Sequence, residues 1–206
     1  MAQAIYKSWF VDFEPFADRD FADSELGEIP ADWRIGPLSE LITIKYGKDH
    51  KKLGDGTIPV FGSGGIMRFV NTALYKSESV LIPRKGTLNN VIYVDQPFWS
   101  VDTMFYSEMN RPNLAKFVYF FLRSKNLSSM NAGSAVPSMT TALLYSLPVA
   151  IPPDSELSRY EEVTGTLFKQ IQTNRVENVN LTAIRDSLLP RLMSGELSVS
   201  DAEDVK

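Results

Sequence analysis

Apolar residues along the C-terminal quarter of the chain recur every three or four positions. From the double proline at 152–153 to Pro190, Gly165 is the one Gly or Pro, and the spacing of apolar residues predicts a single amphipathic helix. About 35 residues make a rod of about 50 Å, which is longer than a small domain needs. The apolar seam is narrow and contains Asn174 and Asn178, so we expect a second helix along it, with the asparagines fixing its register. The alternative is a solvated helix that packs on its own domain. The predicted pairing positions are Leu167, Ile171, Asn174, Asn178, Leu181, Ile184, Leu188 and Leu192.

The remaining pattern changes along the chain between helical and strand-like spacing. Residues 1–13 predict a short helix with several aromatic side chains to bury, and residues 14–28 form an acidic, loop-like linker. Short β-branched runs at 80–82 and 91–94, bounded by Gly, Pro and Asn, predict strands. Residues 113–124 are apolar nearly all round, which indicates a buried helix. The fold class that follows is α+β, with short strands, helices and a long C-terminal helix.

This pattern divides the chain into three segments. Residues 1–28 are the N-terminal helix and linker, residues 29–153 a globular domain, and residues 154–206 the long helical region. The chain has 206 residues, of which 44% are apolar, enough for one ordinary domain with an extension. AIYKSWF at 4–10 and AIRDSLL at 183–189 share Ala, Ile and Ser at the same spacing. This echo suggests that the chain is one of two similar units.

Charge is distributed unevenly, although the formal net charge is only −4. Residues 1–40 hold three basic and nine acidic side chains, residues 41–90 hold eight and three, and residues 155–206 hold six and nine. A basic middle between acidic ends is typical of a local surface that binds a polyanion. The absence of Cys excludes disulfides and thiolate chemistry. The first eleven residues resemble neither a signal peptide nor a membrane span, so we expect a cytoplasmic protein that does not enter the membrane.

No pattern in the sequence predicts a catalytic residue or a metal site. His50 is the one histidine, and it lies in a charged loop without a second ligand or a nucleophile at a suitable spacing. The glycines of FGSGG at 61–65 are not followed by the Lys-Ser or Lys-Thr of a phosphate-binding loop. Asp95 and Asp102 are more typical of turn-forming carboxylates than of an acid-base pair.

A binding site for nucleic acid fits the middle of the chain better. Lys and Arg on Gly-rich turns suit phosphate contacts, whereas Arg suits guanine and Asn suits adenine. The alternative for each residue taken singly is a turn-forming role, above all for Asn89 and Asn90, which suit a hairpin turn. The predicted DNA-binding residues are Lys45, Lys48, Lys51, Lys52, Ser63, Arg68, Arg84, Lys85, Asn89, Asn90, Ser138 and Thr140.

Seven short motifs follow one another in a characteristic order. They are IPADWRIGPLSEL, GTIPVFGSGG, SVLIPRKGT, PFWSVDTMF, GSAVPSMTT, LPVAIPP and AIRDSLLPRLMSGELSV. In this order they closely resemble the target-recognition domain and distal helical region of the specificity subunit of type I restriction-modification systems. The opening MAQAIYKSWFVDFEPF resembles the end of that family's central helix, which accounts for the echo.

The resemblance implies a non-catalytic subunit that recognises double-stranded DNA and directs its partners to a bipartite target. Those partners are adenine methyltransferase subunits and a restriction and translocase subunit, and S-adenosylmethionine, ATP and magnesium belong to them. The chain matches the second half of a full family member. We expect either a half-subunit that forms a homodimer or pairs with another half-subunit through an antiparallel helix pair, or a fragment or split gene product whose first half is elsewhere.

Two alternatives stay open. One is a specificity subunit of a combined restriction and methylation system, of the type IIB or IIG kind. The other is a helical interaction adapter that binds no DNA.

Overall fold

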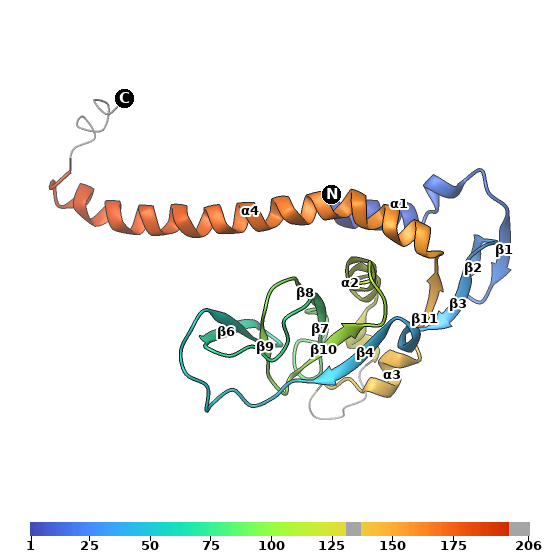
Figure 1. Ribbon diagram of the computed structural model, residues 1–206, viewed down its shortest axis with the longest axis horizontal. Coiled ribbons are helices and arrows are strands. Elements are labelled where there is room, and N and C mark those ends of the chain that lie inside the picture. Colours follow the sequence, from blue (N-terminus) through green and yellow to red (C-terminus); the bar gives the residue numbers. More distant parts are fainter. Residues whose placement is uncertain (131–136, 198–206) are drawn as a thin grey trace. The chain divides into compact units, whose positions relative to one another are not determined.

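The computed structural model describes residues 1–130 and 137–197, and the chain forms two compact units, Met1–Glu161 and Glu162–Lys206 (Figure 1). Residues 133–136 of the GSAVPSMTT motif and residues 198–206 of the predicted helical region lie outside the described residues. Both strands and helices are present, and a long helix follows them, so the predicted α+β class is confirmed.

The first unit is built on a four-stranded antiparallel sheet in the order β4-β10-β7-β8. Its strands are β4 (Ile42–Tyr46), β7 (Ser79–Pro83), β8 (Ile92–Val94) and β10 (Met104–Met109). All five residues of β7 are buried, which is why this strand reads as a continuous apolar run rather than an alternating one. The predicted strands at 80–82 and 91–94 are thereby confirmed.

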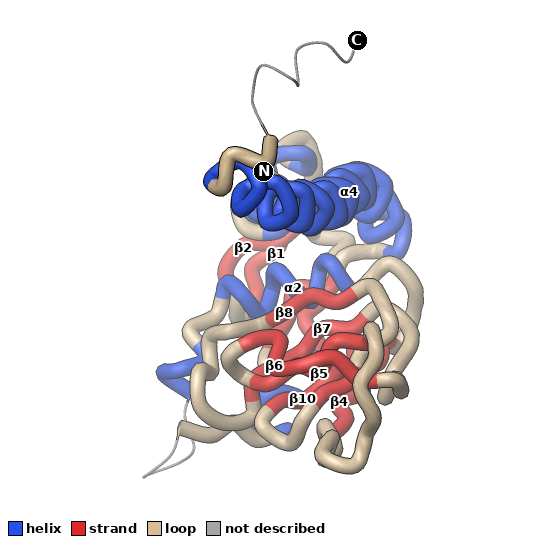
Figure 2. Tube along the Cα trace, turned by 90° about the vertical axis from the view of Figure 1, so that its left-hand side faces the viewer, coloured by secondary structure: helices blue, strands red, loops and turns tan. Residues whose placement is uncertain are grey.

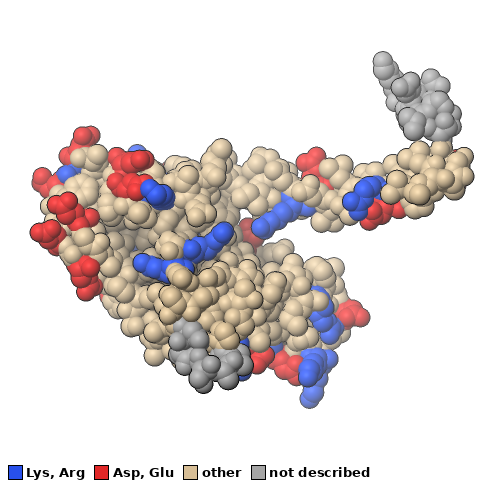
Figure 3. Space-filling model, turned by 180° about the vertical axis from the view of Figure 1, so that it is seen from behind, with Lys and Arg blue, Asp and Glu red and all other residues tan. Residues whose placement is uncertain are grey.

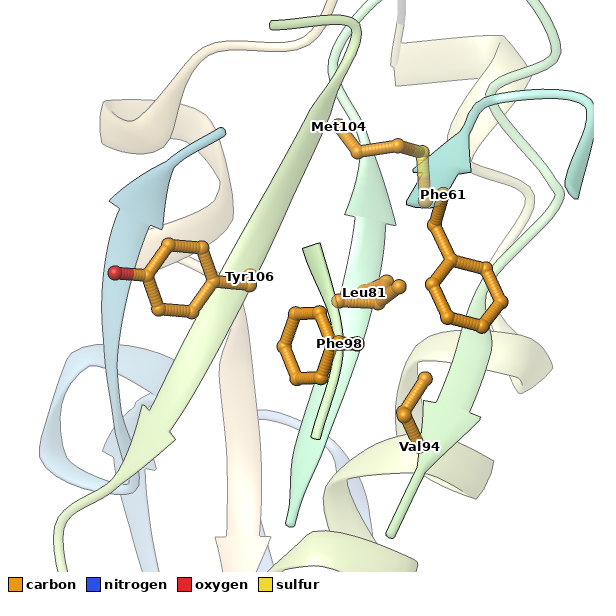
Figure 4. Packing of buried hydrophobic residues seen from close by; sticks show 6 residues of the cluster. All are labelled: Phe61, Leu81, Val94, Phe98, Met104 and Tyr106. Carbon is orange, nitrogen blue, oxygen red and sulfur yellow. The ribbon is translucent and has the colours of Figure 1, made fainter. Parts of the chain in front are cut away.

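A second, three-stranded sheet lies beside the first. It consists of β5 (Ile58–Gly62), β6 (Gly65–Val70) and β9 (Trp99–Ser100), with β5 antiparallel to β6 and parallel to β9. A cluster of buried side chains from both sheets and the segment before β9 fills the space between them (Figure 4). The cluster contains Phe61, Leu81, Val94, Phe98, Met104 and Tyr106.

The predicted loop at 14–28 is wrong, because most of this acidic stretch is ordered secondary structure. A short 3-10 helix (Glu14–Phe16) is followed by the hairpin of β1 (Phe21–Ser24) and β2 (Gly27–Pro30). Phe16 is fully buried and its ring lies edge-on to Trp33, 5.3 Å between centroids. Aromatic burial, which the acidic composition conceals, therefore decides the fold of this stretch.

Two further strands and three short helices complete the sheet region. β3 (Arg34–Pro37) pairs antiparallel with β11 (Pro148–Ile151). The 3-10 helix at Leu38–Glu40 leads into β4, and α3 (Thr141–Tyr145) precedes β11. A further 3-10 helix spans Leu127–Met130.

Two predicted helices of the first unit are confirmed. α1 (Ala2–Phe10) buries Tyr6, Trp9 and Phe10, and the Phe10 ring lies 4.8 Å from that of Phe117. Phe117 belongs to α2 (Ala115–Ser124), which lies against β7 and β8 (Figures 1 and 2). Because α2 is covered by α1 on one side and by the sheet on the other, it is apolar nearly all round.

The long helix α4 (Asp154–Met193) starts in the first unit and continues into the second. It is a single helix of 40 residues, which confirms the prediction and extends it three residues past Pro190. Its first turns are tied to α2 by Lys116, whose buried ammonium forms ion pairs with Glu161 and, at 3.1 Å, with Glu78. None of the helices in the described chain combines the length and the apolar character needed to cross a bilayer.

Beyond residue 170, α4 carries a row of solvent-exposed apolar side chains. Ile171, Leu181, Ile184, Leu188 and Leu192 are all exposed. Gln170 Nε2 donates to Asn174 Oδ1 at 2.9 Å along the same helix. These residues follow the spacing expected for a helix that pairs with another helix, and that pairing stays a prediction.

A candidate nucleic-acid interface at the loop end of the sheet

Strand register brings several loops to the same end of the four-stranded sheet. Tyr46, the last residue of β4, lies opposite Phe105, and Pro83, the last residue of β7, lies opposite Met104, where β10 begins. The segments after β4, after β7 and before β10 must therefore meet. We call this region the loop end, and it comprises residues 46–57, 62–68, 83–90, 101–103 and 137–140.

Main-chain hydrogen bonds hold the loop that follows β7. The Arg84 amide donates to the Thr103 carbonyl at 2.9 Å, and the Met139 amide donates to the Arg84 carbonyl at 2.8 Å. The Gly86 amide donates to the Pro137 carbonyl at 3.2 Å. Gly86 has a φ of +84°, a left-handed conformation that favours glycine. The turn of PRKGT at 83–87 is therefore fixed mainly by its backbone.

The Arg84 side chain is held over an aromatic ring. Its guanidinium carbon lies 5.3 Å from the centre of the Tyr46 ring, and Nη1 donates to the Asp102 carbonyl at 3.1 Å. Tyr46 is itself 53% exposed. A guanidinium held in this way loses little conformational freedom when its other N–H groups bind a ligand. Guanine is the base whose two major-groove acceptors, O6 and N7, match the paired N–H donors of arginine.

Lys85 and Ser138 come from segments that are far apart in the sequence and lie side by side. The two residues form an isolated antiparallel bridge. The structure thus brings Arg84, Lys85 and Ser138 of the predicted site together.

The loop after β4 presents three lysines at the same end. The Lys48 amide donates to the Ser100 carbonyl at 2.7 Å, and Trp99 Nε1 donates to the Lys48 carbonyl at 2.9 Å. Lys48, Lys51 and Lys52 are all exposed. The backbone of this loop is anchored, whereas its charged side chains remain in solvent, as phosphate contacts require.

Two carboxylates of this loop are engaged locally. The Lys51 amide donates to Asp49 at 3.0 Å, and this hydrogen bond holds the pKa of Asp49 below its usual value. Arg68 Nη2 donates to the Leu53 carbonyl at 3.0 Å and to Asp55 at 2.9 Å. Arg68 of β6, predicted as a DNA contact, therefore stabilises the loop after β4 by binding Leu53 and Asp55.

Four other predicted residues take part in local hydrogen bonds. Asn89 Oδ1 accepts from the Ser128 amide at 2.9 Å, and Thr140 caps α3 by accepting from the Leu143 amide at 3.3 Å. Asn90 Nδ2 donates to the Ser63 carbonyl at 2.8 Å, which ties the β5–β6 turn to the loop after β7. These contacts agree with the turn-forming alternative.

Lys45 differs from the other predicted residues, because it lies within β4 and not on a loop. Its ammonium is 3.6 Å from Glu108 on the neighbouring strand β10.

Sequence reasoning missed three residues of the loop end. Tyr46 supports Arg84, Thr103 anchors it through the main chain, and Met67 lies exposed on β6. The available signals are that Tyr46 closes a short β-branched run and that Met67 stands two residues after a pair of glycines.

The loop end is positively charged, whereas a second surface of the first unit is strongly acidic. The loop end holds six Lys or Arg against three Asp, a local charge of +3. Residues 12–32, around the β1–β2 hairpin, hold eight exposed Asp or Glu against one Arg. Figure 3 shows acidic side chains gathered at the side that carries this hairpin. A polyanion is therefore attracted to the loop end and repelled by the β1–β2 hairpin.

A family model described as the type I restriction modification DNA specificity domain matches residues 30–182, and the chain belongs to this family. The chain is 25% identical to the type I restriction enzyme MjaIX specificity subunit of Methanocaldococcus jannaschii, over 98% of its own length and 53% of that protein. It is 28% identical to the EcoDI specificity subunit of Escherichia coli, over 84% of its own length and 40% of that protein. The chain thus spans about half the length of the curated relatives it matches.

A solved structure confirms the fold. The S subunit of a type I restriction-modification system from M. genitalium superposes with a TM-score of 0.64 at 21% identity. The match covers 79% of this chain and 46% of that one. The resemblance that the sequence motifs indicated is therefore confirmed.

Proposed function

We propose that this chain recognises a specific sequence in double-stranded DNA as a non-catalytic specificity subunit of a type I restriction-modification complex. The observation that carries the proposal is the loop end, where strand register gathers six cationic side chains, among them Arg84, which is held over Tyr46. Membership of the DNA specificity domain family supports it. The bases read through this surface are those of one half of a bipartite target.

The cationic side chains divide into two roles. Lys48, Lys51, Lys52 and Lys85 are flexible point charges that suit phosphates, and they would fix the position of the domain on the duplex. Arg84, with its guanidinium stacked on Tyr46, would read a base edge. Affinity would thus come mainly from the lysines, and sequence preference from the arginine.

The proposed partners follow from the names of the relatives, which are type I restriction enzyme specificity subunits. They are the methyltransferase subunits and the restriction and translocase subunit of the complex. S-adenosylmethionine, ATP and magnesium would be bound by those subunits, and this chain would hold no cofactor. The proposed location is the cytoplasm.

The exposed apolar seam of α4 supports a further part of the proposal. Five exposed Leu or Ile side chains on one helix favour pairing with a second helix. The partner would be a second copy of this chain or another half-subunit, arranged antiparallel so that two recognition domains face two half-sites.

The test is the salt dependence of binding to random-sequence duplex DNA. If four lysines neutralise four phosphates, the slope of log affinity against log salt is about −3.6. Replacing Lys51 and Lys52 together by Ala should reduce the slope to about −1.8, because two phosphate contacts are lost.

Lys76→Ala is the matched control. Lys76 is also an exposed lysine, and it lies before β7, at the opposite end of that strand from Arg84. Its slope should equal that of the wild type. Failure of the wild-type protein to retain any duplex at low salt, alone and with a methyltransferase subunit, would favour the interaction adapter instead.

A further inference from the structure

The β5–β6 hairpin contains an irregularity next to the loop end. Pairing passes from Val60 opposite Arg68 to Phe61 opposite Ile66, so Met67 is the extra residue of a β-bulge. β6 is an edge strand of its sheet. A bulge of this kind re-aims a side chain and strengthens the local twist, and bulges are frequent beside functional sites.

The outer strand of this hairpin exposes large apolar side chains. Ile66 is 55% exposed, Met67 58% and Phe69 49%. Three such residues lie within four positions of one strand, and exposed apolar side chains gathered in this way usually mark contact with a partner.

Met67 lies close to the residues that position Arg84. A Cβ atom added to Gly62 would come within 2.6 Å of Met67 Sδ and 3.6 Å of Thr103 Oγ1. The Met67 side chain therefore lies over Gly62, where the absence of a Cβ leaves room for it, and Thr103 is close to the same position. The Thr103 carbonyl in turn accepts the hydrogen bond from the Arg84 amide.

Charge identifies the partner of this apolar surface. Ile66 and Met67 belong to the loop end, which carries a charge of +3, and Phe69 follows directly after it. The Lys and Arg side chains of the loop end would disfavour a purely apolar protein partner. A DNA base edge combines both features, since a thymine presents a methyl group between flanking phosphates. The occupant that matches the whole surface is therefore duplex DNA.

We propose that the tip of the β5–β6 hairpin, with the exposed side of β6, enters the major groove and that Met67 contacts the C5-methyl group of a thymine in the target. This inference rests on the proposed function and names one of its specificity-determining residues. The major groove, about 12 Å wide, admits a two-stranded ribbon, and apolar contact with the thymine methyl is an established form of base readout. Arg84 would read a base near this thymine.

The experiment begins with selection of binding sites from a library of random duplexes. Wild type, Met67→Ala, Met67→Leu and Met109→Ala are compared. Met109 is the matched control, because it ends β10, whereas the start of that strand, Met104, borders the loop end. Met109 therefore lies away from the proposed DNA contact. The wild-type site is then scanned with deoxyuridine in place of each thymine, which removes only the methyl group.

The wild type should lose affinity about fourfold at one thymine, which corresponds to about 0.8 kcal/mol for one buried methyl group. Met67→Ala should be insensitive to the same replacement, whereas Met67→Leu and Met109→Ala should keep the fourfold loss. Circular dichroism identical to wild type would confirm that the exposed side chain is not needed for folding.

Two failures are distinguishable. If the wild type selects a site but shows no deoxyuridine effect, or if Met67→Ala keeps that effect, the role of Met67 is overturned while DNA recognition stands. If the wild type selects no sequence at all, sequence-specific recognition is overturned, and the role of Met67 with it.

Discussion

Replacing Ser107 by Ala is expected to destabilise the first unit by about 2–6 kcal/mol. Ser107 Oγ accepts from the Val80 amide at 2.9 Å and donates to the Val80 carbonyl at 2.9 Å. Ser79 Oγ accepts from the Ser107 amide at 3.1 Å and donates to the Ser107 carbonyl at 2.7 Å. Both serines are fully buried. The loss of either hydroxyl therefore leaves one buried N–H and one buried carbonyl without partners, at about 1–3 kcal/mol each.

The double variant Ser79→Ala with Ser107→Ala should cost less than the sum of the two single variants. Direct pairing of β7 with β10 ends at Leu81 opposite Tyr106, and the two hydroxyls bridge the next position, Val80 opposite Ser107. With both hydroxyls absent, these two residues can pair directly and restore two hydrogen bonds. We expect a coupling energy of about 1–3 kcal/mol.

Urea unfolding followed by tryptophan fluorescence measures these energies, because Trp9, Trp33 and Trp99 all lie in the first unit. Ser77→Ala is the control: Ser77 is exposed, and its loss should change stability by less than about 0.5 kcal/mol. Single variants as stable as the control, or strictly additive energies, would refute the bridging role of the serines.

Three further outcomes are expected. Burial raises the pKa of Tyr6 and of Tyr160 far above 10, so both stay protonated in the folded unit. Their stabilisation is complete below pH 10 and falls above it by about 2.7 kcal/mol per pH unit for two protons. Tyr6→Phe should reduce the measured slope by about 1.4 kcal/mol per pH unit, the share of one proton, and an unchanged slope would contradict the contribution of Tyr6. Leu181→Asp with Leu188→Asp should lower the sedimentation coefficient by separating paired helices; equal sedimentation would disprove pairing. Four residues inserted before Leu181 add about 6 Å, so methylome sequencing should find the gap between half-sites longer by one or two base pairs of about 3.4 Å. A constant gap would exclude α4 as a spacer.

The helices and central strands were predictable because their signals are local. The seam of α4 and the apolar runs of α2 and β7 follow from spacing and burial alone. The β1–β2 hairpin was not predictable, since Phe21-Ala22-Asp23-Ser24 shows no alternation of buried and exposed residues. Its fold depends on contacts such as that of Phe16 with Trp33, which join residues 17 positions apart.

The candidate site was predictable in composition but only partly in arrangement. Arg84, Lys85 and Ser138 were identified from residue type and lie together in the structure. Asn89 was chosen for its ability to bind adenine, yet it binds the Ser128 amide, 39 positions along the chain. Residue type shows what a side chain can bind, whereas the identity of its neighbour depends on tertiary contacts that the sequence pattern does not carry.

The loop end is held largely through the backbone, and this has a consequence for evolution and engineering. The anchors of Arg84, Gly86 and Lys48 are amide-to-carbonyl hydrogen bonds, which any residue except proline can make at the donor positions. Arg84 and Lys48 can therefore each be replaced by another residue with little loss of stability of the first unit. The loop end can therefore change its ligand preference by substitution of its side chains alone. A library of variants at positions 48, 51, 52, 67, 84 and 85 would sample new DNA sequence preferences while the backbone stays the same.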